Sequence, residues 1–135
     1  MNTAAISEAA QASLAGTLPF PEIVAKLVAA GVEYYYVDYV GRRTTFFDGV
    51  GASASTTITY ENLPPVAPEL DVPALRANIR DSQQNKQNYR EFTIRAMQGG
   101  VQGYFAFLRG QRVTYLGRTG DQHTEWFPGT GPAAD

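Results

Sequence analysis

Apolar positions near the start of the chain follow first a helical period and then a strand pattern. Ile23, Leu27 and Ala30 recur at the spacing of one helical face. Gly31 follows them, and glycine readily takes the left-handed conformation that ends a helix. The next residues, 32–40, are mostly aromatic or β-branched, which is typical of a strand. The pattern therefore predicts a helix from Pro21 to Ala30 followed by a strand.

The same reasoning predicts the remaining elements. Gly41-Arg42 is typical of a two-residue hairpin loop, so residues 43–48 should return as an antiparallel strand. Asp71 should cap a helix from Val72 to about Asp81, and Thr3 should cap one over 3–14. Residues 63–72 are rich in proline and predict a linker, while 129–135 predict a frayed tail. Further expected elements are a helix over 89–98 and strands over 55–60, 102–109, 112–117 and 123–127.

The chain contains an internal repeat. A shift of 69 positions aligns residues 20–51 with 89–120 without a gap. The identities are Glu22/Glu91, Gly31/Gly100, Val32/Val101, Tyr35/Tyr104, Gly41/Gly110, Arg43/Arg112, Thr45/Thr114 and Gly51/Gly120. Chance agreement between two helix–hairpin units is the alternative, but the absence of gaps favours duplication. We predict a single α+β domain over 1–135, with a mostly antiparallel sheet from two αβββ repeats (about 20–60 and 89–128) and helices packed on one face.

Composition and charge narrow the classes of function. The 135 residues carry a formal net charge of −2, which argues against nucleic acid as a partner. The chain has no cysteine, and its single histidine excludes a His-rich metal site, so we expect no metal and no cofactor. No apolar run reaches the roughly 20 residues that cross a bilayer. The start of the chain is a poor signal peptide, so we expect a cytoplasmic protein without a membrane partner.

The two faces of the predicted sheet differ in character. One is almost wholly apolar and should be covered by helices. The other combines aromatic, charged and hydroxyl residues: Tyr36, Asp38, Val40, Arg43, Thr45, Phe47, Phe105, Phe107, Arg109, Arg112, Thr114 and Leu116. Further helices or a partner subunit would make its aromatic residues ordinary packing residues. Alternatively, Arg43, Arg109 and Arg112 would converge on an anion above an aromatic floor. An error in the turn register would exchange the two faces.

This second face supplies the candidate ligand-binding residues. They are Tyr36, Asp38, Arg43, Phe105, Arg109 and Arg112. The candidate catalytic residues are His123, the only histidine, and Glu125, which lies two residues on and therefore on the same side of a strand. A histidine and a carboxylate so placed can act as an acid–base pair. A hydrogen-bonded structural histidine is the alternative, and Trp126 is expected to close the core.

Several stretches resemble a known family. These are FPEIV at 20–24, GVEYYYVD at 31–38, YLGRTG at 115–120 and HTEWFP at 123–128. They look like the YbcV-like family, a bacterial and prophage domain of unknown function in which some members are labelled phage envelope proteins. The resemblance covers about 20–128 and implies a small α+β domain, but it implies no catalytic or binding residue. Residues 53–63 and the linker match only loosely, and no coat-protein feature supports the phage label.

The sequence leaves three functions open. The leading one is a binding module for a small molecule or a protein partner, because the second face mixes aromatic and charged residues. The first alternative is an enzyme that uses His123 and Glu125, with Asp38 as a further contributor. The second is a homodimer, a structural protein of prophage origin whose interface is the second face.

Overall fold

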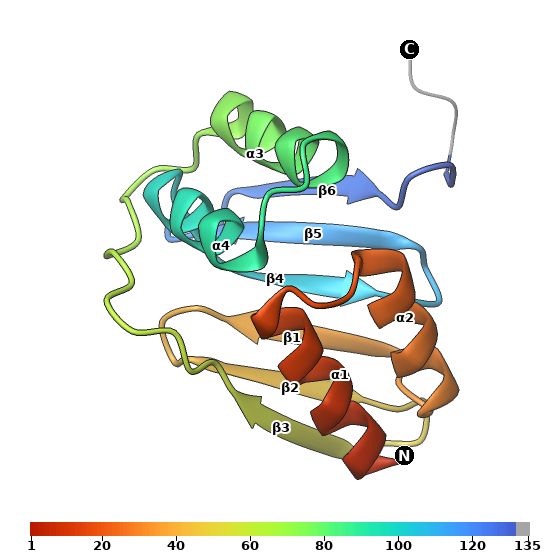
Figure 1. Cartoon of the computed structure of the whole chain (residues 1–135). Helices are drawn as coiled ribbons and strands as arrows, with labels where there is room; N and C mark the ends of the chain where they lie inside the picture. Colours follow the sequence, from red (N-terminus) through yellow and green to blue (C-terminus); the bar gives the residue numbers. More distant parts are fainter. Residues whose placement is uncertain (132–135) are drawn as a thin grey trace.

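The computed structural model describes residues 1–131 as two layers (Figure 1). One layer is a six-stranded antiparallel sheet with the strand order β3-β2-β1-β4-β5-β6. Four helices pack on one face of this sheet, and within residues 1–131 no helix covers the other face. The predicted α+β class, with an antiparallel sheet and helices on one face, is confirmed.

The elements occur twice in the same order. The first series is α1 (Thr3–Ala15), α2 (Phe20–Ala29), β1 (Tyr34–Asp38), β2 (Arg43–Phe47) and β3 (Ser53–Thr57). The second is α3 (Val72–Gln84), α4 (Tyr89–Gln98), β4 (Val101–Phe107), β5 (Arg112–Gly117) and β6 (Gln122–Trp126). When 69 is added to the first and last residue numbers of α1, α2 and β3, the results are the bounds of α3, α4 and β6. The repeated unit is therefore ααβββ, one helix longer than the predicted αβββ.

The first helices of the two repeats begin in the same way. The side chain of Asn2 accepts a hydrogen bond from the backbone N–H of Ala5, and that of Asp71 accepts one from Ala74. Each of these short polar side chains caps a helix by satisfying one of its unpaired backbone donors. The prediction for Asp71 is confirmed, whereas Thr3 is the first helical residue and Asn2 is the cap.

Strands β1 and β4 meet at the centre of the sheet. They pair antiparallel with Tyr36 opposite Phe105, two residues that occupy the same position in the two repeats. An approximate two-fold axis therefore passes between them, perpendicular to the sheet. This axis relates β3 to β6, so the two edges of the sheet are equivalent strands.

The hairpin loops are longer than predicted, but the faces of the sheet are as predicted. Asp38 pairs with Arg43 and Phe107 with Arg112, so each loop holds four residues, 39–42 and 108–111, instead of two. The pairing differs from the predicted one by two residues, and side chains alternate with a period of two. Each side chain of the strands therefore stays on the face to which the sequence assigned it, whereas Val40 and Arg109 lie in the loops.

The core lies between the sheet and the helices. The covered face contributes side chains that are at most 7% exposed: Tyr35, Val37, Tyr39, Phe46, Tyr104, Ala106, Leu108, Val113 and Tyr115. The helices contribute Ile6, Ile23, Leu27, Leu75, Phe92 and Ala96. The predicted apolar face is therefore the core face, as the alternation of the strands requires.

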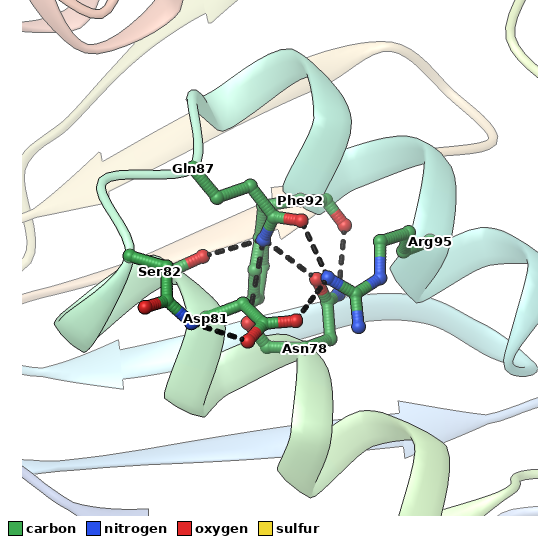
Figure 2. A network of polar contacts seen from close by, with 7 residues as sticks. Asn78, Asp81, Ser82, Gln87, Phe92 and Arg95 are labelled. Carbon is green, nitrogen blue, oxygen red and sulfur yellow. Dashed lines mark hydrogen bonds and ion pairs between the residues drawn. The ribbon is translucent and has the colours of Figure 1, made fainter.

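A polar network joins α3 to α4 (Figure 2). Asn78 is only 1% exposed, and its amide donates to the carbonyl of Phe92 over 2.9 Å. The Gln87 amide nitrogen donates to Asn78 Oδ1 over 2.8 Å, while the Gln87 amide oxygen accepts from Arg95 over 2.6 Å. Arg95 also donates to Asp81 over 2.8 Å. The buried Asn78 amide is thus hydrogen-bonded at both its nitrogen and its oxygen, as burial of a polar group demands.

Candidate functional site

Three rows of side chains cross the uncovered face of the sheet. The central row is Ser55, Thr45, Tyr36, Phe105, Thr114 and Thr124. One flanking row, called here the aromatic row, is Ser53, Phe47, Tyr34, Phe107, Arg112 and Trp126. The other, called the polar row, is Thr57, Arg43, Asp38, Gly103, Leu116 and Gln122. The two-fold axis exchanges the aromatic row with the polar row.

The aromatic side chains of this face shield one another. The rings of Tyr34 and Phe47 stack with centroids 4.7 Å apart and planes 15° apart. Phe107 continues the same layer, because its ring is nearly parallel to that of Phe105 at a centroid distance of 5.7 Å. All four residues are half-buried although no helix of residues 1–131 covers them. The uncovered face therefore carries a row of half-buried aromatic rings that pack face against face.

A hollow lies beside the aromatic row. Its volume is about 700 Å³, and it is lined by Glu33, Tyr34, Phe107, Arg109, Gly110, Arg112, Thr114 and Thr124. The lining combines two cationic side chains, one acidic side chain, two aromatic rings and the hydroxyls of two threonines. Such a combination of apolar surface with a few polar groups is typical of a site for a small ligand.

Arg112 is held at this hollow by the neighbouring strand. Its guanidinium carbon lies 4.1 Å from the centre of the Trp126 ring, directly across β5 and β6. Its Nε donates to the carbonyl of Gly110 over 3.4 Å. A guanidinium over an indole is attracted by the negative face of the ring. Trp126 therefore lies on the uncovered face, and the prediction that it closes the core is wrong.

Arg109 forms a looser contact at the same hollow. Its guanidinium lies 3.6 Å from the Glu33 carboxylate, and its side chain is 85% exposed. Ion pairs between exposed groups are weak because water and salt screen them. Arg109 therefore keeps most of its positive charge available to a ligand.

The structure separates the predicted ligand-binding residues into three groups. Arg109 and Arg112 line the hollow, whereas Arg43 lies beside Asp38 in the polar row at the opposite end of the sheet. The two-fold axis is the reason, because it places Arg43 and Arg112, which are equivalent in the repeat, at opposite ends. The predicted convergence of three arginines is therefore wrong. Tyr36 and Phe105 meet in the central row and line no part of the hollow.

His123 and Glu125 form the predicted pair, but on the other side of the sheet. His123 Nε2 lies 2.9 Å from Glu125 Oε1, and the two side chains are 12% and 36% exposed. His123 pairs with Tyr115 and Glu125 with Val113, two residues of the core face. The pair therefore lies on the helix-covered face of edge strand β6, with the sheet between it and the hollow.

Buried phenols form a second polar cluster beneath the sheet. The hydroxyls of Tyr89 and Tyr104 lie 2.6 Å apart. Burial is the main cause that raises the pKa of both phenols, because it disfavours the charged form. Burial likewise raises the pKa of Tyr35, Tyr39 and Tyr115. These hydroxyls stay protonated at neutral pH. Those of Tyr89 and Tyr104 bond to each other, whereas the buried Tyr39 hydroxyl has no hydrogen-bond partner within residues 1–131.

The molecule is thus an α+β domain with a single open sheet face, two-fold pseudosymmetry and one hollow beside the aromatic row. No protein-family model matches the chain, and no curated protein matches it. The resemblance to the YbcV-like family stays a prediction. Within residues 1–131, no helix combines the length and the apolar character needed to cross a membrane. Over the same residues, no three histidine, aspartate or glutamate side chains gather as a metal-ligand set.

Proposed function

We propose that the protein is a binding module whose ligand lies on the uncovered face of the sheet, at the aromatic row. The observation that carries this proposal is the position of Arg112. Its guanidinium is fixed over Trp126 beside a hollow of about 700 Å³ on a face that no helix of residues 1–131 covers. A cation held next to packed aromatic rings favours binding, since neither group has to be ordered when a ligand arrives.

The surroundings of the candidate acid–base pair support a binding function better than a catalytic one. His123 is nearly buried against the core face, and its hydrogen bond to Glu125 satisfies one ring nitrogen. The hollow lies across the sheet from this pair, so a ligand bound there would not reach it. His123 and Glu125 accordingly serve the proposed function as structural residues of edge strand β6.

The test is a ligand screen with a readout that locates the bound molecule. A set of small metabolites is screened by thermal shift, because a ligand that binds only the folded state raises the melting temperature. Each hit is then titrated into ¹⁵N-labelled protein. We expect amide signals of the aromatic row, Tyr34, Phe107 and Arg112 among them, to shift more than those of the polar row. Hits that perturb only the polar row or the helices would contradict the proposal.

A second candidate function, self-association, is favoured by the distribution of charge between the two repeats. Residues 2–62 hold six acidic and three basic side chains, whereas residues 71–131 hold five acidic and eight basic ones. The two repeats, with their helices included, therefore carry opposite net charge. A second copy could place its acidic half over the basic half of the first. Light scattering at increasing salt tests this, because such a dimer should dissociate as the charges are screened, and a monomer at low salt contradicts it.

A further inference from the structure

The duplication provides an internal comparison for the hollow. The two-fold axis relates the aromatic row to the polar row, and only the arginine, Arg112 or Arg43, is the same in both. At the other positions that matter for the hollow, Tyr34 corresponds to Gly103, Phe107 to Asp38 and Trp126 to Thr57. Arg109 corresponds to Val40. One ancestral surface has therefore become two different ones.

The fold does not require the residues of the aromatic row. The polar row has the same strand pairing, with Asp38 opposite Arg43 where the aromatic row has Phe107 opposite Arg112. Both hairpins close with a four-residue loop that has one residue in the left-handed region, Arg42 at φ 57° and Gln111 at φ 58°. β4 departs from β1 near Gly103, where its register shifts. The hairpins nevertheless close in the same way with either set of side chains, so Phe107 and Arg109, which replace Asp38 and Val40, need a reason other than hairpin closure.

The charge of the hollow matches a monoanion. Arg109 and Arg112 contribute two positive charges, and Glu33 contributes one negative charge 3.6 Å from Arg109. Within residues 1–131 the only hydrogen bond from the Arg112 side chain is that from Nε to Gly110. Its two terminal nitrogens thus remain for a ligand, and a guanidinium offers them as a fork that suits a carboxylate.

The remaining lining suits a flat apolar body. The rings of Tyr34 and Phe107 are stacked, with planes 28° apart and centroids 6.2 Å apart, so both contribute apolar ring atoms to the wall of the hollow. The hydroxyls of Thr114 and Thr124, 3.0 Å apart, lie on the same face. An aromatic ring of a ligand would stack or pack edge-on against this surface.

We propose that the hollow binds a small aromatic carboxylate, with Arg112 and Arg109 on the carboxylate and Tyr34 and Phe107 against the ring. This inference rests on the proposed binding function and deepens it by naming the class of ligand. Arg112 is the principal contact, because Trp126 and Gly110 hold its guanidinium in place. Arg109 adds charge from the rim.

The experiment uses 2-naphthoate as the probe, titrated into the full chain by calorimetry and by ¹⁵N-resolved NMR. The duplication supplies the matched variants: Arg112→Gln at the hollow and Arg43→Gln at the equivalent position in the polar row. We expect Arg112→Gln to weaken binding by about ten-fold or more, because a charge-assisted hydrogen bond is lost. Arg43→Gln should change the affinity by less than about two-fold, since Arg43 lies at the other end of the sheet.

Two further probes separate this inference from the proposed function. The neutral analogue 2-naphthylmethanol tests the carboxylate, and cyclohexanecarboxylate tests the flat ring; both should bind more weakly than 2-naphthoate. If the alcohol binds as tightly and shifts the aromatic row, the binding module stands and the anion preference is overturned. If no probe shifts the amide signals of the aromatic row, both the binding function and the ligand class are overturned.

Equal losses of affinity in Arg112→Gln and Arg43→Gln also overturn the inference. Should Arg112→Gln fail to fold, Arg109→Gln replaces it, with a loss of affinity again expected.

Discussion

Tyr36 and Phe105 face each other across β1 and β4 with ring centroids 4.5 Å apart. Each occupies the equivalent position in its own repeat. Hydroxyl pairs flank them symmetrically. Thr45 and Ser55 lie 3.3 Å apart on one side, and Thr114 and Thr124 lie 3.0 Å apart on the other. The central row thus keeps the two-fold symmetry that the two flanking rows have lost. The two repeats join through side chains of the uncovered face as well as through backbone pairing.

The first prediction concerns this central contact. Phe105→Ala should lower the free energy of unfolding by about 2 kcal/mol, because it removes the ring that contacts Tyr36 and stacks on Phe107. The loss should be smaller than for a fully buried phenylalanine, since Phe105 is only half-buried. Urea unfolding followed by circular dichroism measures it. The control is Phe105→Tyr, which copies the residue at the equivalent position and should cost less than about 1 kcal/mol. Equal stability of Phe105→Ala and the wild type would contradict the prediction.

The sequence predicted the repeated strands but not the full length of the repeat. Glycines and strand aromatics, such as Gly31/Gly100 and Tyr35/Tyr104, kept their identity because turn geometry and core packing restrict them. The helices α1 and α3 have diverged, with only Ala5/Ala74 and Ser13/Ser82 identical. A helix needs only a cap and one apolar stripe, and many sequences meet that requirement.

The candidate site was predicted in part, for a geometric reason. The face of each strand residue follows from alternation, so Arg109 and Arg112 were correctly placed with the aromatic residues. Which arginines lie close together depends on the strand order, and only the central β1–β4 pairing shows that Arg43 is distant. The contribution of Trp126 was missed because it depends on the pairing of β5 with β6.

The second prediction uses two equivalent glycines. Gly31 and Gly100 both follow a helix with positive φ, 93° and 91°. A methyl group at Gly31 would meet Met1 only at 3.5 Å, whereas at Gly100 it would collide with the carbonyl of Glu69 in the linker. Gly31→Ala should therefore cost only the backbone strain, about 1–2 kcal/mol. Gly100→Ala must also displace the linker and should cost at least about 3 kcal/mol. Thermal or urea unfolding compares the two, and equal losses would contradict the proposed role of the linker.

The third prediction concerns the α3–α4 network shown in Figure 2. The first repeat has Ala9 and Leu18 where the second has Asn78 and Gln87. Asn78→Ala and Gln87→Leu should each cost about 1–3 kcal/mol. The first removes the hydrogen bonds of Asn78 to Phe92 and Gln87, and the second leaves the buried Asn78 amide oxygen without its donor. The double variant has alanine and leucine at these two positions, as the first repeat does. We expect it to cost at least about 1 kcal/mol less than the two single losses together. Urea unfolding of all four proteins measures this coupling, and strict additivity would show that the two amides do not act as a unit.

The last prediction concerns alkaline pH and the buried phenols. Burial raises the pKa of Tyr35, Tyr104 and Tyr115 above the ordinary value of 10.0, so these groups stay protonated in the folded state after the unfolded chain has begun to ionise. Stability is therefore unaffected by them below pH 10 and is lost as the pH rises from there toward the folded pKa values.

Tyr115→Phe isolates one of these groups. The variant removes one ionising phenol, so above pH 10 its stability should fall less steeply than that of the wild type, by up to about 1.4 kcal/mol per pH unit. Unfolding in urea between pH 8 and 11.5 provides the slopes, and absorbance at 295 nm shows when phenolate forms. Parallel slopes for the two proteins would mean that Tyr115 ionises without unfolding, in contradiction to its position in the core.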